Sequence, residues 1–552
     1  MQIYCKNFDE YINVDGGDSL RKIADSLADR LPFRPIGALV NYKTESLGYQ
    51  LFGPKMVEFI PRNSEHGRRM YVRSLCMMLY KAVHDLYPGT RLRIAHSIGS
   101  GYYCRLSGTE VTPDVIRRLL GYMRQTSAQD FPFVRRERLT SHVVQLFREQ
   151  GLDDKVKLLE SLRSLYTVFY ELDGVFDSLY GELAPSTGYV DVFNIVQYKK
   201  GFLLLGFDAA DDSRPAAPAV LDKVQEAFDE YQQFNDVIGV RNVAELNEVA
   251  DKEKVKLLIN VAEALHNKKI ASIAEEIARR NAAGGAKIVL VAGPSSSGKT
   301  TFSKRLGIQL VTNLIIPHVI SLDNYFVDRE RTPLDENGEY DYESLYAIDV
   351  ERFNSDLNRL INGETVTLPR YDFHTGKNDP EGGETISLDG NKILLIEGIH
   401  GLNPELTSHI APEMKFKIYV SALTSLSIDD HSWIPTTDNR LLRRIIRDAK
   451  YRGTAAIDTI HRWASVRRGE EKWIFPFQEN ADSMFNSSLL FEVGVMKDYA
   501  EQLLRKIPHD REEYSEAYRL LRFLDSFAQL KGDNIPSTSL LLEFLGGSSF
   551  HY

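Results

Sequence analysis

The chain has 552 residues, too many for one hydrophobic core, so we expect several domains. Hydrophobic residues make up 43% and charged residues 26% of the chain, values typical of globular proteins that exclude a fibrous or wholly disordered class. The formal net charge of −10 argues against a protein that coats nucleic acid without specificity. Without a secretory leader or a run of about 18 apolar residues, the sequence predicts a cytoplasmic protein that does not enter a membrane.

The N-terminal half predicts two α+β units. Residues 1–62 alternate short β-rich runs with one helical pattern, and residues 63–215 combine longer helices with strands. Residues 216–283 are mostly helical and predict a connector that ends in NAAGGA. Residues 284–505 form the predicted C-terminal α/β domain, and residues 506–552 form a helical tail.

Apolar runs of strand length begin at Lys287 and alternate with helical patterns. The runs are KIVLVAG, HVISLD, KILLIEG and FKIYVSA. Continuous apolar strands separated by helices are typical of a parallel sheet that is covered on both faces. The sequence therefore predicts a doubly wound α/β domain.

The segment GPSSSGKT matches the P-loop pattern GxxxxGK[ST], follows a predicted strand and opens a predicted helix. Backbone N–H groups of such a loop cradle phosphates, Lys299 reaches the terminal phosphates, and Thr300 binds magnesium. The alternative is a glycine-rich turn without a ligand, which the strand and helix context disfavours. The residues assigned to ATP binding are Gly293, Pro294, Ser295, Ser296, Ser297, Gly298, Lys299, Thr300 and Thr301.

Two acids end predicted strands at the edge where ligands gather in open parallel sheets. Asp323 is interpreted as a general base that accepts a hydroxyl proton while the oxygen attacks the γ-phosphorus. The alternative is a cap of the strand end or an acid near the magnesium ion. Glu397 is interpreted as the acid that holds magnesium, and its alternative is an ordinary turn residue.

The segment TTDNRLLRRIIRDAKYRG predicts a helix with Asp438 as its N-cap and Gly453 just past its end. Its arginines share one side at positions i, i+3, i+4 and i+7: Arg440, Arg443, Arg444 and Arg447. Arg443 and Arg447 are predicted to neutralise transition-state charge, and Arg440 to contact substrate. The alternative is a solvated charged face.

These segments together resemble the uridine kinase and phosphoribulokinase family from about residue 287 to about 500. Their order is GPSSSGKT, SLDNYF, EYDYESLYAIDV, LPRYDF, LLIEGIHGLN and RLLRRIIRDAKYRG. The resemblance implies that Asp323 is the catalytic base and that the YDF segment contacts a nucleoside acceptor. The acceptor-site candidates are Tyr325, Asp341, Tyr371 and Phe373, in addition to Arg440.

Two segments depart from the family pattern and bear on the acceptor. His374, Thr375 and Gly376 follow YDF, and DDHSWIPTT at residues 429–437 is an apparent insertion before the arginine-rich helix. For Tyr371 and Phe373, packing in a loop is the alternative interpretation.

The N-terminal half has a resemblance of its own. Residues 1–62 resemble a TGS domain, a β-grasp module, and residues 63–215 resemble the second additional domain of threonyl-tRNA synthetases. LYKAVHDLYPGTRLRIAHSIGSGYYC carries the second resemblance, but Arg73 and Met77 stand where those enzymes place an editing histidine pair. Editing chemistry is therefore not expected, and RNA contact through these domains is left as an open alternative.

We therefore expect an ATP- and magnesium-dependent kinase of a small-molecule acceptor, with the 5′-hydroxyl of a nucleoside such as uridine as the favoured acceptor. One alternative is a kinase of another small alcohol or sugar phosphate. An alternative of another class is a nucleotide-gated protein that associates with RNA or ribosomes. The sequence is compatible with an oligomer and leaves its state open.

Overall fold

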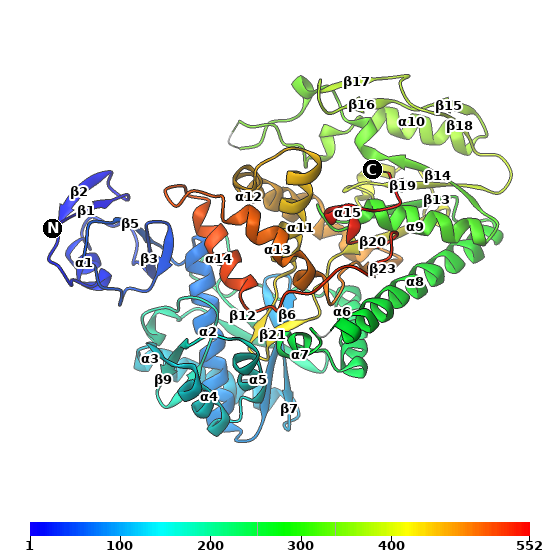
Figure 1. The fold of residues 1–552 in the computed structure, drawn as a ribbon. Coiled ribbons are helices and arrows are strands. Elements are labelled where there is room, and N and C mark those ends of the chain that lie inside the picture. Colours follow the sequence, from blue (N-terminus) through cyan, green and yellow to red (C-terminus); the bar gives the residue numbers. More distant parts are fainter. Residues whose placement is uncertain (251, 337, 552) are drawn as a thin grey trace.

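The computed structural model describes residues 1–250, 252–336 and 338–551. The chain begins with a small module that projects from the rest of the molecule (Figure 1). Its mixed sheet has the order β2-β1-β5-β3-β4 and packs on α1 (Leu20–Ser26). The strands are β1 (Gln2–Cys5), β2 (Glu10–Asn13), β3 (Gly37–Val40), β4 (Lys43–Glu45) and β5 (Met56–Ile60).

The second unit is built around α2 (Glu65–Leu86), whose buried residues form the centre of a large core. Its two antiparallel sheets have the orders β11-β12-β7-β6 and β10-β9-β8. The strands are β6 (Arg91–Ile98), β7 (Gly101–Ser107), β8 (Val134–Leu139), β9 (Tyr166–Leu172), β10 (Val175–Asp177), β11 (Asn194–Tyr198) and β12 (Gly201–Leu205). The further helices are α3 (Pro113–Gln129), α4 (Thr140–Glu149) and α5 (Asp153–Ser161).

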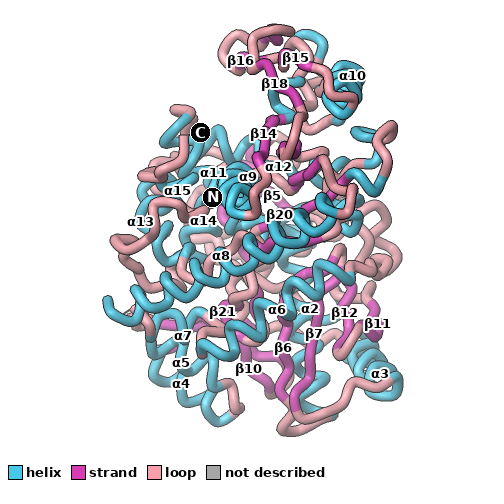
Figure 2. The backbone as a smooth tube through the Cα atoms, turned by 90° about the vertical axis from the view of Figure 1, so that its right-hand side faces the viewer, coloured by secondary structure: helices cyan, strands magenta, loops and turns pink. Residues whose placement is uncertain are grey.

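Helices connect this unit to the C-terminal domain. In chain order these helices are α6 (Asp222–Ile238), α7 (Val243–Glu248) and α8 (Lys252–Ala282). Figure 2 shows α8 running across the molecule below the C-terminal sheet. Its Ile270 and Ile277 are buried in the core under that sheet, so α8 forms part of the C-terminal domain's packing.

The C-terminal sheet is parallel and has the order β14-β19-β13-β20-β23. The four predicted apolar runs form four of these strands, which confirms the predicted parallel sheet, and the short β23 was not predicted. The strands are β13 (Ile288–Ala292), β14 (Ile316–Ser321), β19 (Lys392–Glu397), β20 (Lys415–Ser421) and β23 (Ser483–Asn486).

Alternate residues of β13 enter two different cores, because successive side chains of a strand point to opposite faces. Val289 packs with α8 and with α9 (Lys299–Thr312), whereas Leu290 packs with α10 (Val350–Ile361). Helices thus cover both faces of the sheet.

Beyond α10, two short two-stranded sheets extend the domain at the top of Figure 2. One pairs β15 with β18 and the other pairs β16 with β17. Their bounds are β15 (Thr365–Thr367), β16 (Arg370–Asp372), β17 (Lys377–Asp379) and β18 (Thr385–Ser387). The remaining elements are β21 (Ser427–Asp429), β22 (Ser432–Trp433), α11 (Thr436–Tyr451), α12 (Ala456–Trp473), α13 (Glu492–Leu504), α14 (Tyr514–Leu524) and α15 (Leu542–Leu545).

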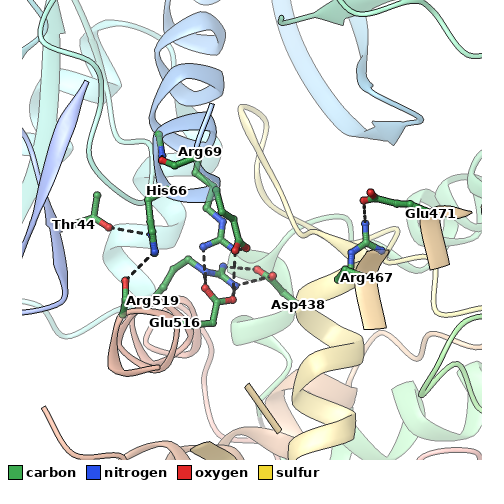
Figure 3. A network of polar contacts seen from close by, with 12 residues as sticks. Thr44, His66, Arg69, Asp438, Arg467, Glu471, Glu516 and Arg519 are labelled. Atoms are coloured by element: carbon green, nitrogen blue, oxygen red, sulfur yellow. Dashed lines mark hydrogen bonds and ion pairs between the residues drawn. The ribbon is translucent and has the colours of Figure 1, made fainter. Parts of the chain in front are cut away.

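Two groups of ion pairs connect α11 and the hairpin before it to distant parts of the chain. At the insertion, Lys155 of α5 pairs with Asp429 of β21 at 2.8 Å, and both side chains are buried. At the start of α11, Asp438 accepts two hydrogen bonds from Arg519 of α14, which also pairs with Glu516 (Figure 3). Glu516 in turn pairs with Arg69 of α2, so three separate segments meet there.

Within the described part of the chain, none of the helices combines the length and the apolar character needed to cross a membrane.

Candidate nucleotide-binding and catalytic site

The predicted P-loop connects the end of β13 to the start of α9. A Cβ atom on Gly293 would overlap the carbonyl oxygen of Val420, so a side chain cannot be accommodated there. Gly298 has a φ of +83°, a backbone conformation that glycine adopts without steric cost. These two glycines let the loop turn tightly between the strand and the helix.

Two hydroxyl groups in this loop are buried and have no hydrogen-bond partner within the described residues, those of Ser296 and Ser297. Lys299 Nζ donates a hydrogen bond to the Pro294 carbonyl oxygen at 3.2 Å. Burial lowers the pKa of Lys299, while Glu397 and Asp323 oppose that shift. Unpaired donors, a lysine and a helix N-terminus at one place make an anion-binding cradle.

Strand register brings the two predicted acids to the same edge of the sheet. Glu397, the last residue of β19, is aligned with Val291 of β13 and with Ser321 of β14. Asp323 follows two residues after Ser321, and its backbone N–H donates to Ser321 Oγ at 3.3 Å. The Ser321 hydroxyl also donates to Glu397 Oε1 at 3.4 Å.

Both acids have raised pKa values. Burial raises the pKa of Glu397 to about 7, the charge of Asp323 adds to the rise, and Lys299 opposes it. The pKa of Asp323 is raised by the protein atoms around it and lowered by Lys299 and Arg452. Because Asp323 is exposed to solvent, water limits this rise. A carboxylate whose pKa is shifted toward neutrality is a better proton acceptor than an ordinary aspartate.

Sequence reasoning did not single out Glu343, which lies in the same electrostatic environment. Burial raises its pKa to about 7, with Glu470 adding to the rise and Arg444 opposing it. Its Oε2 atom is buried without a hydrogen-bond partner within the described residues. The predicted substrate residue Asp341 accepts a hydrogen bond from the Glu343 backbone at 3.2 Å, which fixes the local turn. The only sequence signal for Glu343 was its place in the acidic segment EYDYES.

The arginine face of α11 meets the outside of the P-loop. Arg440 donates to the Ser295 carbonyl oxygen at 2.8 Å and is paired with Glu470. Arg443 is paired with Glu492 and donates to the Ser296 carbonyl oxygen at 3.4 Å.

Each of these two guanidinium groups is at most 1% exposed. Arg440 and Arg443 therefore brace the loop from behind and do not face solvent. Glu470 also accepts from the Ser295 backbone N–H at 3.2 Å, so the acid holds both the arginine and the loop.

Two further arginines of α11 stay partly exposed. Arg444 donates to the Ser295 hydroxyl at 2.8 Å, and Arg447 pairs with Asp448 at 3.0 Å. Arg447 also lowers the pKa of Asp323, so its charge acts at the predicted base.

Of the two predicted ends of α11, the C-terminal end is confirmed and the N-cap is wrong. Asp438 is not its N-cap, because the helix begins at Thr436 and the Asp438 side chain pairs with Arg519. Gly453 follows the C-cap residue Arg452 with a φ of +62°, as expected for the first residue past the cap.

The aromatic residues predicted to contact the acceptor lie in two environments. The Tyr325 hydroxyl is buried and donates to Asp356 Oδ2 at 3.1 Å, so this side chain packs inside the domain. Tyr371 is 7% exposed and Phe373 60% exposed, and their rings lie 5.0 Å apart beside Phe326. Of the three predicted aromatics, Phe373 is the one that presents its ring to solvent.

The model of the phosphoribulokinase/uridine kinase family matches residues 288–490. The uridine kinase of Staphylococcus epidermidis is 30% identical over 198 residues, which cover 35% of this chain and 84% of that protein. The uridine kinase of Staphylococcus haemolyticus is 28% identical over 196 residues, with the same coverage of 35% and 84%. A solved D-glycerate 3-kinase from Cryptococcus neoformans matches 49% of this chain and 89% of its own, at 15% identity and a TM-score of 0.22.

The family model leaves residues 1–287 outside its match. The relative that is 30% identical is covered over most of its own length. The chain therefore belongs to the phosphoribulokinase/uridine kinase family, through a P-loop kinase domain at residues 288–490.

Proposed function

We propose that the chain is an ATP-dependent kinase that transfers the γ-phosphate to the 5′-hydroxyl of a nucleoside such as uridine. The observation that carries the proposal is the meeting of the P-loop, Asp323 and Glu397 at one edge of the parallel sheet. The uridine kinases among the relatives support the nucleoside as acceptor.

In this proposal the loop from Gly293 to Thr301 holds the phosphates of ATP through backbone N–H groups and the Lys299 ammonium. Asp323 accepts the proton of the attacking hydroxyl, a role for which its raised pKa is suited. Arg447 contributes positive charge near the transferred phosphoryl group. Arg440 and Arg443 are assigned a supporting role, because both are enclosed in ion pairs behind the loop.

Magnesium binds oxygen ligands, and usually takes one or two from the protein and others from substrate phosphates. Thr300 and Glu397 offer a hydroxyl and a carboxylate at the phosphate end of the site, and we assign the ion to them. Bound there, magnesium would neutralise charge that develops on the phosphate oxygens. Occupation would favour the ionised form of Glu397, whose pKa is raised to about 7.

The acceptor side is assigned to the segment that carries Asp341 and to the YDF segment. Phe373 is the exposed ring on which a nucleobase would stack, with the Tyr371 ring packed edge-on against it. Tyr325 is assigned to packing, because its hydroxyl is bonded to Asp356.

The identities of the N-terminal units are also proposals. We assign residues 1–62 to a TGS-like β-grasp module and residues 63–215 to a unit like the second additional domain of threonyl-tRNA synthetases. RNA contact through these units, a cytoplasmic location and an oligomer remain predictions of the sequence.

The test is to incubate the purified chain with magnesium, ATP and a panel of nucleosides, and to follow phosphorylated product. Asp323→Asn keeps the shape of the side chain and removes the base. We expect turnover to fall by about 100- to 10,000-fold, the range that general base catalysis contributes. Asp389→Asn is the matched control, because Asp389 is an acid whose side chain is 74% exposed and pairs with Lys392.

Nucleoside phosphorylation that collapses in Asp323→Asn and persists in Asp389→Asn would support the proposal. ATP hydrolysis without any phosphorylated nucleoside would contradict the nucleoside acceptor and direct the search to sugar phosphates, other alcohols or RNA-gated hydrolysis.

A further inference from the structure

A carboxylate from the C-terminal end of the chain lies at the N-terminus of α9. Glu543 Oε2 accepts hydrogen bonds from the Thr301 backbone N–H at 3.2 Å and from the Thr301 hydroxyl at 2.6 Å. Thr301 is the third residue of α9, and the first N–H groups of a helix have no partner within the helix. Glu543 therefore satisfies a donor that belongs to the phosphate-binding end of this helix.

The charge of Glu543 also reaches the other groups of the site. It opposes the lowering of the Lys299 pKa, and it adds to the rise of the Glu397 pKa. Both residues belong to the phosphate and magnesium end of the proposed site. The Glu543 carboxylate thus interacts with the same charged groups, Lys299 and Glu397, that an ATP phosphate would meet.

Packing holds this carboxylate in place. We call residues 537–551 the C-terminal strap, which contains α15. Leu540 lies directly against Gly298 of the P-loop, and the Phe544 ring lies 5.0 Å from the Arg443 guanidinium. Lys450 donates a hydrogen bond to the Leu545 carbonyl oxygen.

The strap therefore touches both the P-loop and α11, and Figure 1 shows α15 beside α9.

We infer that Glu543 is an internal competitor for the phosphates of ATP, and that the C-terminal strap keeps the ligand-free site closed. The inference rests on the proposed function, since it concerns the same P-loop. Helix N-termini bind anions, and a carboxylate and a phosphate at one N-terminus repel each other. ATP binding then requires Glu543 to leave Thr301 and the strap to loosen.

The opposite interpretation is that Glu543 is a fixed support that keeps the start of α9 in its binding conformation. The two interpretations predict effects of opposite sign. Removing the charge of a competitor strengthens nucleotide binding, whereas removing a support weakens it.

The experiment compares the full-length chain with its Glu543→Gln variant and measures the dissociation constant of Mg-ATP by titration calorimetry. Glutamine keeps the side-chain shape and an oxygen for Thr301, but it lacks the charge. We expect Mg-ATP to bind about ten- to a hundredfold more tightly, because a hydrogen bond to a charged group contributes one to two powers of ten. Asp533→Asn removes one exposed acid from the same tail and should leave the affinity unchanged.

Hydrogen exchange on the unmodified chain provides a measurement that needs no variant. Amides of residues 539–546 should exchange faster when Mg-ATP is present, because the strap loosens. This readout is independent of any phosphorylated product.

Tighter binding by Glu543→Gln together with faster exchange in the strap would support the inference. Equal or weaker binding by the variant, or unchanged exchange in a chain that binds Mg-ATP, would overturn it and leave the kinase proposal intact. A chain that binds Mg-ATP neither with nor without Glu543 would overturn both.

Discussion

Lys155 Nζ lies 2.8 Å from Asp429 Oδ2, and this ion pair joins the N-terminal half of the chain to the hairpin that precedes α11. Lys155 also lies 2.8 Å from Asp177, whose other carboxylate oxygen lies 2.7 Å from His431 Nδ1. The residues of the insertion DDHSWIPTT are thus fixed by α5 and β10. Since the last two residues of this insertion already belong to α11, the N-terminal half positions the helix that braces the P-loop.

Lys155→Met is expected to destabilise the chain by about 3–5 kcal/mol, because it leaves two buried carboxylates without their cation. The free energy of unfolding, measured by denaturant titration, checks this. Lys157→Met is the matched control, since Lys157 is exposed on the same helix. An equal effect of the two variants would contradict the role of the buried pair.

Local patterns allowed the P-loop and its surroundings to be predicted. Strand, loop and helix are contiguous from Lys287 to Leu310, and the acids at 323 and 397 end apolar runs, so spacing alone places them at one sheet edge. The strand β23 was missed because its four residues carry no apolar run.

These local patterns could not predict ion pairs and hydrogen bonds between residues that are distant in the sequence. Glu470 pairs with Arg440 from 30 residues away, and Glu543 meets Thr301 from 242 residues away. The arginine spacing on α11 predicted one cationic side that neutralises charge and contacts substrate. It did not reveal that Glu470 and Glu492 already neutralise two of those arginines.

Arg440→Ala is expected to lower the stability of the chain, whereas Arg447→Ala is expected to lower its turnover. Arg440→Ala removes one of the two arginines that pair with buried Glu470, the other being Arg467, so the free energy of unfolding should fall by about 1–3 kcal/mol. Arg447→Ala leaves Asp448 paired with Arg444 and Arg452, so thermal stability should be largely retained while kcat falls. Thermal unfolding and steady-state turnover, measured on both variants, distinguish them.

The double variant Arg440→Met/Glu470→Met removes both charges together. It should recover part of the stability that Arg440→Ala loses, because an apolar pair of similar volume removes the buried carboxylate while Arg467 keeps its pair with Glu471. No recovery would mean that the hydrogen bond from Arg440 to Ser295 is the contact that matters.

Arg452→Gln is expected to change the pH dependence of kcat/KM. Asp323 must be ionised to act as the base, so the rate rises as the pH increases through its pKa. Arg452 lowers that pKa, and loss of its charge should move the acidic limb of the profile to higher pH. An unmoved limb, with kcat/KM lowered equally at every pH, would show that another group controls the profile.

Glu45→Gln is expected to stabilise the chain at neutral and alkaline pH. Burial raises the pKa of Glu45 on β4 to about 7, and the charge of Glu182 adds to the rise. An unfolded glutamate has a pKa of about 4.3, so the unfolded chain loses this proton first as the pH rises. Folding stability therefore falls between these two pKa values, and the loss is complete above about pH 7.

Glutamine cannot ionise, so the variant avoids this loss. The increase in melting temperature should be largest at about pH 8 and should shrink toward zero as the pH falls to about 4. Glu110→Gln, which makes the same change of charge at an exposed position, should show no such pH-dependent gain. If the two variants gave equal shifts at about pH 8, net charge would be the cause. A larger shift for Glu45→Gln would show that the loss of stability comes from ionising Glu45 in its partly buried position near Glu182.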